Sequence, residues 1–126
     1  METLTRVLKS LRMIDEETVE IHYQDAVDVN EEDMAELLKC LYEFTGGKRL
    51  KRLVVCTKKS SLDMKARHLL QNENKDKRDS IIAEAVVVTS LAQKMSTNFY
   101  LKFIEEIYPS RFFTDDEKAR EWLKAQ

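Results

Sequence analysis

The chain has 126 residues, a length typical of one domain, and we expect residues 1–126 to form a single domain. Hydrophobic residues make up 43% of the chain and occur along its whole length, which excludes a disordered polypeptide. With only 2 glycines and 1 proline, the chain lacks the turn residues that a sandwich or barrel of many short strands needs. Helices must therefore make many of the connections between strands.

No segment of the sequence has the pattern of a membrane span or an export signal. The apolar runs are far shorter than the roughly 18 to 20 residues that cross a bilayer. The amino end, METLTRVLKSL, is too polar for a signal peptide. We therefore expect a cytoplasmic protein.

Charge is distributed unevenly along the chain. Residues 15–36 hold ten acids and no Lys or Arg, whereas residues 48–78 hold eleven basic residues against three acids. The basic stretch lacks the interleaved aromatic residues of many nucleic-acid sites, and the pI is near 5.8, so we expect no nucleic-acid partner. We interpret the two stretches as solvated faces that neutralise one another within the fold or across a contact between copies.

The two cysteines show no pattern of a metal or redox site. Cys40 and Cys56 each lie among apolar residues, without a C-x-x-C pair or a histidine at zinc-ligand spacing. We interpret both as reduced thiols of the core. The sequence predicts no metal and no cofactor.

Two β-rich segments open the chain, residues 4–13 and 18–23, and an acidic turn joins them into an antiparallel hairpin. Apolar and polar residues alternate in the second segment, which predicts one inward and one outward face. The inward residues are Val19, Ile21 and Tyr23, and the outward residues are Glu20, His22 and Gln24.

Caps and apolar spacing predict four helices. Asn30 precedes an acidic first turn and an amphipathic run that Gly46-Gly47 ends. Either Ser60 or Ser61 is expected to cap the second helix, and Thr114 is expected to cap the last one. The third helix follows Thr89-Ser90 and ends before Pro109. The apolar residues of the second and last helices are Leu62, Ala66, Leu69, Leu70, Ala119, Trp122 and Leu123.

Three more strands are predicted, at residues 53–56, 83–88 and 111–113, and the first of them is an apolar run typical of a strand covered on both faces. The resulting order is β-β-α-β-α-β-α-β-α, which requires right-handed crossovers and parallel pairing. The predicted fold class is α/β, a mixed β-sheet with an N-terminal antiparallel hairpin followed by alternating helices and parallel strands.

Three stretches carry a resemblance to a known family: RLVVCT at 52–57, AEAVVVTSL at 83–91 and RFFTDDEKAREWL at 111–123. With the order of elements, they resemble the STAS domains of bacterial anti-sigma-factor antagonists. They are more similar still to the STAS-like, SpoIIAA-like relatives whose shape is related to SEC14 lipid-binding domains. The last stretch is the most specific, because its Phe-Thr-Asp strand end, acidic turn and Ala-x-x-Trp-Leu helix recur in that group. The resemblance spans nearly the whole chain.

This resemblance implies a site in the loop before the second helix. In antagonist STAS domains that loop carries an Asp-Ser pair and a glycine, and phosphorylation of the serine switches off partner binding. Here Ser60 and Ser61 take the position, although Lys58 and Lys59 precede them and no glycine follows. A phosphate or another anion would gain from helix-end amides and from both lysines. The alternative is that the serines only cap the helix.

The third predicted helix carries a broad aromatic surface. Its large residues exceed what one inward face of about 100° readily takes, so Tyr100 and Ile104 are expected at its edge, available to a protein partner or a second subunit. The alternatives are that the group belongs to the core or lines a pocket for a lipid or small apolar ligand. The group consists of Phe99, Tyr100, Phe103, Ile104 and Tyr108.

The sequence favours three functions in decreasing order. The first is a non-enzymatic STAS-like regulatory or protein-interaction module, as a homo-oligomer or with a protein partner, gated by charge at Ser60 or Ser61. The second is a small-molecule or lipid carrier of SEC14-like shape, with a cavity beneath Phe99 and Phe103. The third is a hydrolase-like enzyme using His68, although no triad, zinc site or phosphate loop has its spacing here.

Overall fold

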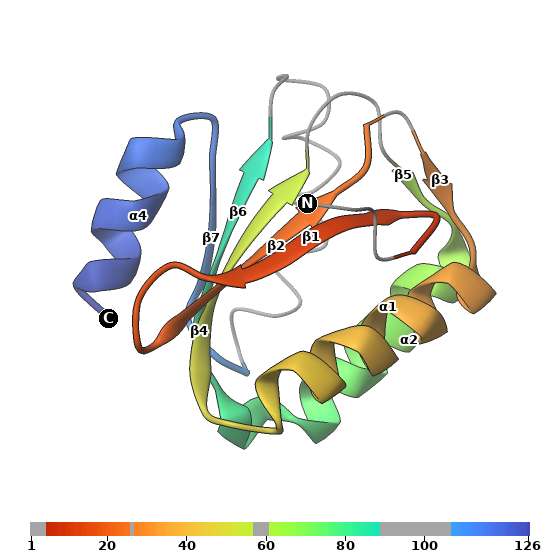
Figure 1. The fold of residues 1–126 in the computed structure, drawn as a ribbon, viewed down its shortest axis with the longest axis horizontal. Helices are drawn as coiled ribbons and strands as arrows, with labels where there is room; N and C mark the ends of the chain where they lie inside the picture. Colours follow the sequence, from red (N-terminus) through yellow and green to blue (C-terminus); the bar gives the residue numbers. More distant parts are fainter. Residues whose placement is uncertain (1–4, 26, 57–60, 89–106) are drawn as a thin grey trace.

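The computed structural model describes residues 5–25, 27–56, 61–88 and 107–126, and Figure 1 shows its ribbon. In this part of the chain the main sheet has the strand order β1-β2-β4-β6-β7, and β3 pairs separately with β5. The strands of the main sheet are β1 (Leu8–Met13), β2 (Thr18–Tyr23), β4 (Leu50–Cys56), β6 (Ile81–Val88) and β7 (Ser110–Phe113). The remaining elements are β3 (Asp28–Val29), α1 (Glu31–Thr45), β5 (Ser61–Leu62), α2 (Met64–Asp76), the 3-10 helix η1 (Arg78–Ser80) and α4 (Asp116–Lys124).

The sheet combines the two kinds of pairing that the sequence predicted. β1 and β2 form an antiparallel hairpin with Leu11 opposite Ile21, whereas β2, β4, β6 and β7 run parallel to their neighbours. The predicted α/β fold class is therefore confirmed. The short pair β3 and β5 was not predicted, because two residues are too few to show an alternating pattern. The predicted third helix lies outside the described residues.

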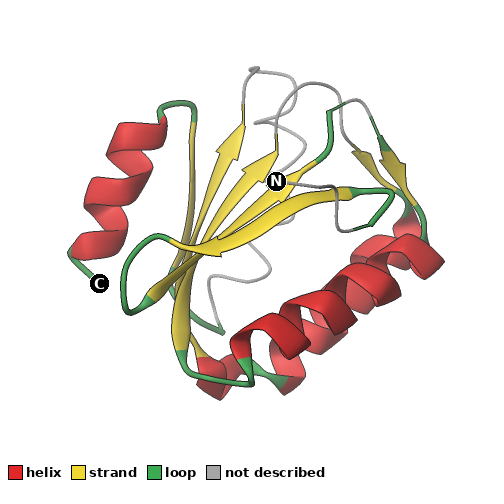
Figure 2. Cartoon of the chain, viewed as in Figure 1, coloured by secondary structure: helices red, strands yellow, loops and turns green. Residues whose placement is uncertain are grey.

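The helices cover the two faces of the sheet unequally. α1 and α2 lie side by side against one face, and α4 covers the other (Figure 2). Successive residues of β4 alternate between these layers, so that Val54 packs in the α1/α2 core and Leu53 packs in the α4 core. The α4 core also contains Ala119 and Leu123, which are buried as predicted. The strand is therefore covered on both faces, as its apolar run indicated.

The first helix begins and ends where its caps predicted. The Asn30 side chain accepts a 2.8 Å hydrogen bond from the amide of Asp33, and the Asp33 carboxylate accepts a 3.1 Å bond from the amide of Asn30. At the other end, Gly46 has φ +64°, a left-handed conformation that glycine adopts without steric cost.

The predicted caps of the other two helices were wrong by one to three residues. Asp63, not Ser60 or Ser61, caps α2 by accepting a 2.8 Å bond from the amide of Ala66. Asp115, not Thr114, caps α4 through the amide of Lys118. Aspartate caps a helix at least as well as serine or threonine, so either position was possible from sequence.

The predicted outward face of β2 was also wrong at Glu20. This residue is only 5% exposed, because long side chains from β1 and α4 lie against its carboxylate, and His22 and Gln24 are half-buried. Arg12 and Arg120 each place a guanidinium nitrogen 2.9 Å from the Glu20 carboxylate. The buried charge is therefore paired from both neighbouring elements.

Candidate functional site

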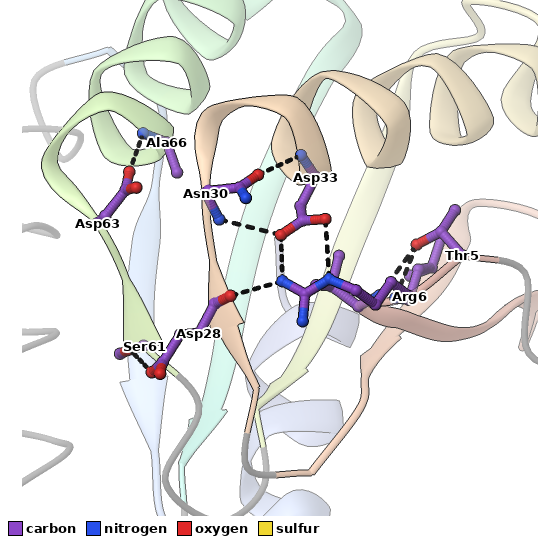
Figure 3. Close-up of polar contacts among 10 residues, drawn as sticks. Thr5, Arg6, Asp28, Asn30, Asp33, Ser61, Asp63 and Ala66 are labelled. Atoms are coloured by element: carbon purple, nitrogen blue, oxygen red, sulfur yellow. Dashed lines mark hydrogen bonds and ion pairs between the residues drawn. The ribbon is translucent and has the colours of Figure 1, made fainter.

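The loop singled out by the sequence leads into β5 and α2. Ser61 is described there, whereas Lys58, Lys59 and Ser60 lie outside the described residues. Ser61 is exposed, and its Oγ donates a 2.5 Å hydrogen bond to Oδ1 of Asp28 in β3 (Figure 3). The structure thus gives this serine a carboxylate partner from a segment 33 residues earlier in the chain.

Two backbone hydrogen bonds hold β5 against β3. The amide of Ser61 donates to the carbonyl of Val27 at 2.9 Å, and the amide of Asp63 donates to the carbonyl of Val29 at 3.0 Å. The side-chain bond between Ser61 and Asp28 lies directly beside this pair. Ser61 therefore takes part in the contact between β3 and β5, and Asp63 caps the helix.

Arg6 ties the N-terminal segment to the same end of the molecule. Its guanidinium donates to both carboxylate oxygens of Asp33 and, at 2.7 Å, to the backbone carbonyl of Asp28 (Figure 3). The hydrogen bond from Arg6 is the main reason that the pKa of Asp33 lies below its usual value. Arg6, Asp28, Asn30, Asp33 and Ser61 thus form one exposed polar network at the start of α1 and β5.

An exposed apolar side chain stands next to this network. Met64, the first residue of α2, is 73% exposed, and Lys65 and His68 of the same helix are also exposed. Single exposed apolar side chains are common on protein surfaces, so the exposure of Met64 marks an available apolar contact and not a docking site by itself. We call Ser61, Met64, Lys65 and His68 the β5–α2 surface.

The aromatic surface predicted on the third helix is described only at its end. Phe99, Tyr100, Phe103 and Ile104 lie outside the described residues. Tyr108 is only 5% exposed, and its hydroxyl donates a 3.0 Å hydrogen bond to Glu84. Tyr108 therefore belongs to the core, which was one of the alternatives for this aromatic group.

Sequence reasoning missed a row of polar residues across three strands, of which Glu84 and Ser110 are buried and Arg52 is half-buried. Arg52 of β4 lies beside Glu84 of β6 in the parallel register, and Glu84 lies beside Ser110 of β7. Arg52 donates a 2.8 Å hydrogen bond to Asn74 of α2, which is 1% exposed. One signal was present in the sequence, since Glu84 interrupts an otherwise apolar strand.

The polar row has an unusual electrostatic environment. Burial raises the pKa of Glu84, and the opposing influences of Arg52 and the Tyr108 hydroxyl do not cancel this effect. Burial, with a smaller contribution from Glu84, also raises the pKa of the Cys56 thiol to about 12. The Ser110 hydroxyl is buried and has no hydrogen-bond partner among the described residues.

Metal ligands and the histidine of the enzyme alternative can be placed only within the described residues. Within them, no three His, Cys, Asp or Glu side chains are grouped as a metal site. His68 is exposed on α2, as expected for a residue at the solvent edge. In the same ranges, no helix is long and apolar enough to span a membrane.

The architecture is a SpoIIAA-like fold. The crystal structure of an uncharacterized protein from the DUF3478 family of Shewanella loihica PV-4, described as having a SpoIIAA-like fold, is similar to this chain. It has a TM-score of 0.69 and 16% sequence identity, and the alignment covers 90% of each chain. At this identity the similarity shows the fold alone.

The family follows from the sequence itself. Residues 12–126 match the family model described as a domain of unknown function, DUF7793, and the chain belongs to that family. The comparison with curated proteins gives no match. The resemblance to STAS-like domains, inferred from three stretches of sequence, is confirmed at the level of the fold.

Proposed function

We propose that residues 1–126 form one STAS-like regulatory domain that performs no catalysis and binds a protein partner through the β5–α2 surface. The observation that carries this proposal is the hydrogen bond between Ser61 and Asp28, which joins β5 to β3 beside the exposed Met64. In this proposal Met64 provides the apolar contact with the partner, and Lys65 and His68 provide polar contacts at its edge.

Charge at Ser61 would gate this surface. A phosphate on Oγ would replace the hydrogen that Ser61 donates to Asp28 and would set two anionic groups against each other. Repulsion would separate β5 from β3 and displace the start of α2, where Met64 lies. The same proposal includes Ser60 as a second phosphate acceptor. Lys58 and Lys59 are the cationic neighbours of that phosphate.

The test compares binding by variants that carry the same change in charge. Ser61→Asp is expected to reduce by about tenfold or more the amount of protein partner that is recovered by chemical cross-linking, whereas Ser61→Ala changes this amount by less than about threefold. Asn72→Asp, on the exposed face of α2 well beyond its first turn, is the matched control and leaves binding unchanged. Equal losses in Ser61→Asp and Asn72→Asp would contradict the proposed gate.

The second candidate function is that of a carrier for a lipid or another small molecule, and one observation favours it. The buried hydroxyl of Ser110 lies beside Glu84, and a bound small molecule with a polar group could give it a hydrogen-bond partner. Phe99 and Phe103, which the carrier proposal places over a cavity, lie outside the described residues. Native and denaturing mass spectra of the purified protein separate the two candidates, because a carrier shows an extra mass that is lost on denaturation.

A further inference from the structure

A pocket lies at the opposite end of the helical layer from Ser61, where α1 and α2 both finish. It is framed by the last turns of the two helices, the loop before β4 and the first residues of that strand. We call it the helix-end pocket. Its lining residues are Val19, Leu38, Leu41, Tyr42, Thr45, Gly47, Lys48, Leu50, Arg52, Glu73, Lys77 and Ser80.

Cations outnumber acids in this lining. Lys48, Arg52 and Lys77 face one carboxylate, that of Glu73, and the Lys77 ammonium is 4.0 Å from it. Lys48 forms no ion pair with any residue that the structure describes. One N–H group of Arg52 donates a hydrogen bond to Asn74, and the guanidinium has further N–H donors. The pocket therefore retains positive charge and hydrogen-bond donors for a ligand.

Helix carbonyl ends also attract cations, which offers a structural explanation for the lysines. Several of these carbonyls already have partners. The amide of Gly46 donates to Tyr42, the amide of Lys48 donates to Thr45, and both the amide and the hydroxyl of Ser80 donate to the carbonyl of Lys77. These bonds meet part of the hydrogen-bonding capacity of the carbonyls, while the negative helix ends remain and offset part of the positive charge of Lys48 and Lys77.

The shape of the pocket limits what it can hold. The cavity volume is about 30 Å³, room for a small polar group. At its rim the Tyr42 side chain is 52% exposed, and the Lys77 ammonium lies 4.3 Å from the centre of its ring. The same ring packs beside Gly47, where an added Cβ would approach it to 3.4 Å. An ionic head group fits inside, and a flat or apolar body must remain against Tyr42.

We propose that the helix-end pocket binds a small phosphorylated metabolite, with its phosphate between Lys48, Arg52 and Lys77 and its body against the Tyr42 ring. Lysine and arginine hold phosphate through charge-assisted hydrogen bonds, which are stronger than neutral ones. An aromatic ring at the rim adds affinity for a flat or apolar body. This site is independent of the β5–α2 surface and of the gate at Ser61.

The test uses calorimetric titration at constant ionic strength with two probes, inorganic phosphate and phenyl phosphate. Both are expected to bind saturably, with phenyl phosphate tighter by about fivefold because its ring reaches Tyr42. Lys48→Gln is expected to weaken both probes by about tenfold. Tyr42→Ala is expected to remove only the advantage of phenyl phosphate.

Lys75→Gln is the matched control, because Lys75 is an exposed cation of α2 outside the pocket. It is expected to leave both affinities unchanged, and circular dichroism checks that every variant is folded. An absence of saturable binding, or equal losses in Lys75→Gln and Lys48→Gln, would overturn the site. Equal affinity of the two probes would overturn the contact with Tyr42.

Discussion

The sheet buries one glutamate on each face, and the two carboxyl groups are accommodated differently. Glu20, on the α4 face, meets the guanidinium groups of Arg12 and Arg120 at 2.9 Å each. Glu84, on the α1/α2 face, accepts a hydrogen bond from the neutral Tyr108 hydroxyl, and burial raises its pKa.

Each residue lies one strand in from an edge of the sheet, so the difference reflects the side chains that cover them. Glu20 of β2 is reached by Arg12 of β1 and Arg120 of α4, whose side chains remain 57% and 33% exposed and keep their aliphatic parts against the protein. Glu84 of β6 accepts its hydrogen bond from the buried Tyr108 and lies beside the half-buried Arg52 of β4. The acid that two partly exposed cations reach is held by ion pairs, whereas at Glu84 the effect of burial exceeds that of Arg52 and favours the protonated form.

The largest expected effect concerns the thiol of Cys56, which lies on the same face of the sheet as Glu84. Because the pKa of Cys56 is raised to about 12, its alkylation by iodoacetamide at about pH 8 should be about a thousandfold slower than in the unfolded chain. Mass spectrometry of peptides containing Cys56 measures the rate. Glu84→Gln should accelerate the reaction, since Glu84 is the second cause of the raised pKa. Labelling at the unfolded rate in the folded protein would contradict this environment.

The next effect is expected on the Glu20 face. Replacing both Arg12 and Arg120 by Met leaves a buried carboxylate without its cations and should lower the free energy of unfolding by about 3 kcal/mol. Urea unfolding measures the change. Adding Glu20→Gln to this double variant removes the unpaired charge and should restore most of the loss. If the double variant is as stable as the wild type, the arginines do not compensate the buried charge.

A smaller effect is expected in the pH dependence of stability. Because the folded-state pKa of Glu84 lies above its ordinary value of 4.5, unfolding free energy should fall as pH rises from that value through the folded-state pKa. Glu84→Gln still accepts the bond from Tyr108 and should be more stable than wild type near neutral pH by about 1 kcal/mol. Glu43→Gln, on the exposed face of α1, is the control and should leave the curve unchanged. Identical curves for wild type and Glu84→Gln would be the contrary result.

The smallest effect is expected in the exposed network around Arg6. Arg6→Gln should move the pKa of Asp33 back toward its ordinary value, because the bond from Arg6 is the main cause of its depression. The stabilisation linked to Asp33 is present above the ordinary pKa and is lost as pH falls through the folded-state pKa, so Arg6→Gln should reduce only this acid sensitivity. An NMR titration of the Asp33 carboxyl carbon measures the shift, and an unchanged pKa would rule out Arg6 as its cause.

Local signals account for the parts of the fold that the sequence predicted. The cap at Asn30, the end of α1 at Gly46 and the hairpin all depend on residues close together in the chain. The burial of Glu20 was missed because its partner Arg120 is 100 residues away, on a helix whose docking position no local pattern shows.

The candidate site was likewise predicted only in part. The family resemblance gave the position of Ser61, but it could not reveal Asp28 as its partner or Asp63 as the cap of α2. Those contacts depend on β3 and β5, two pairs of residues that meet only in the folded chain. The helix-end pocket likewise joins residues of α1, β4 and α2 that are separated along the sequence.

The central claim is that charge at Ser61 releases β5 from β3, and hydrogen exchange tests it most directly. The amides of Ser61 and Asp63 are bonded to Val27 and Val29, so Ser61→Asp should make the amides at positions 61 and 63 exchange faster than they do in Ser61→Ala. The amides of β4 and β6 should keep their protection in both variants. Unchanged exchange at positions 61 and 63 in Ser61→Asp would contradict the gate.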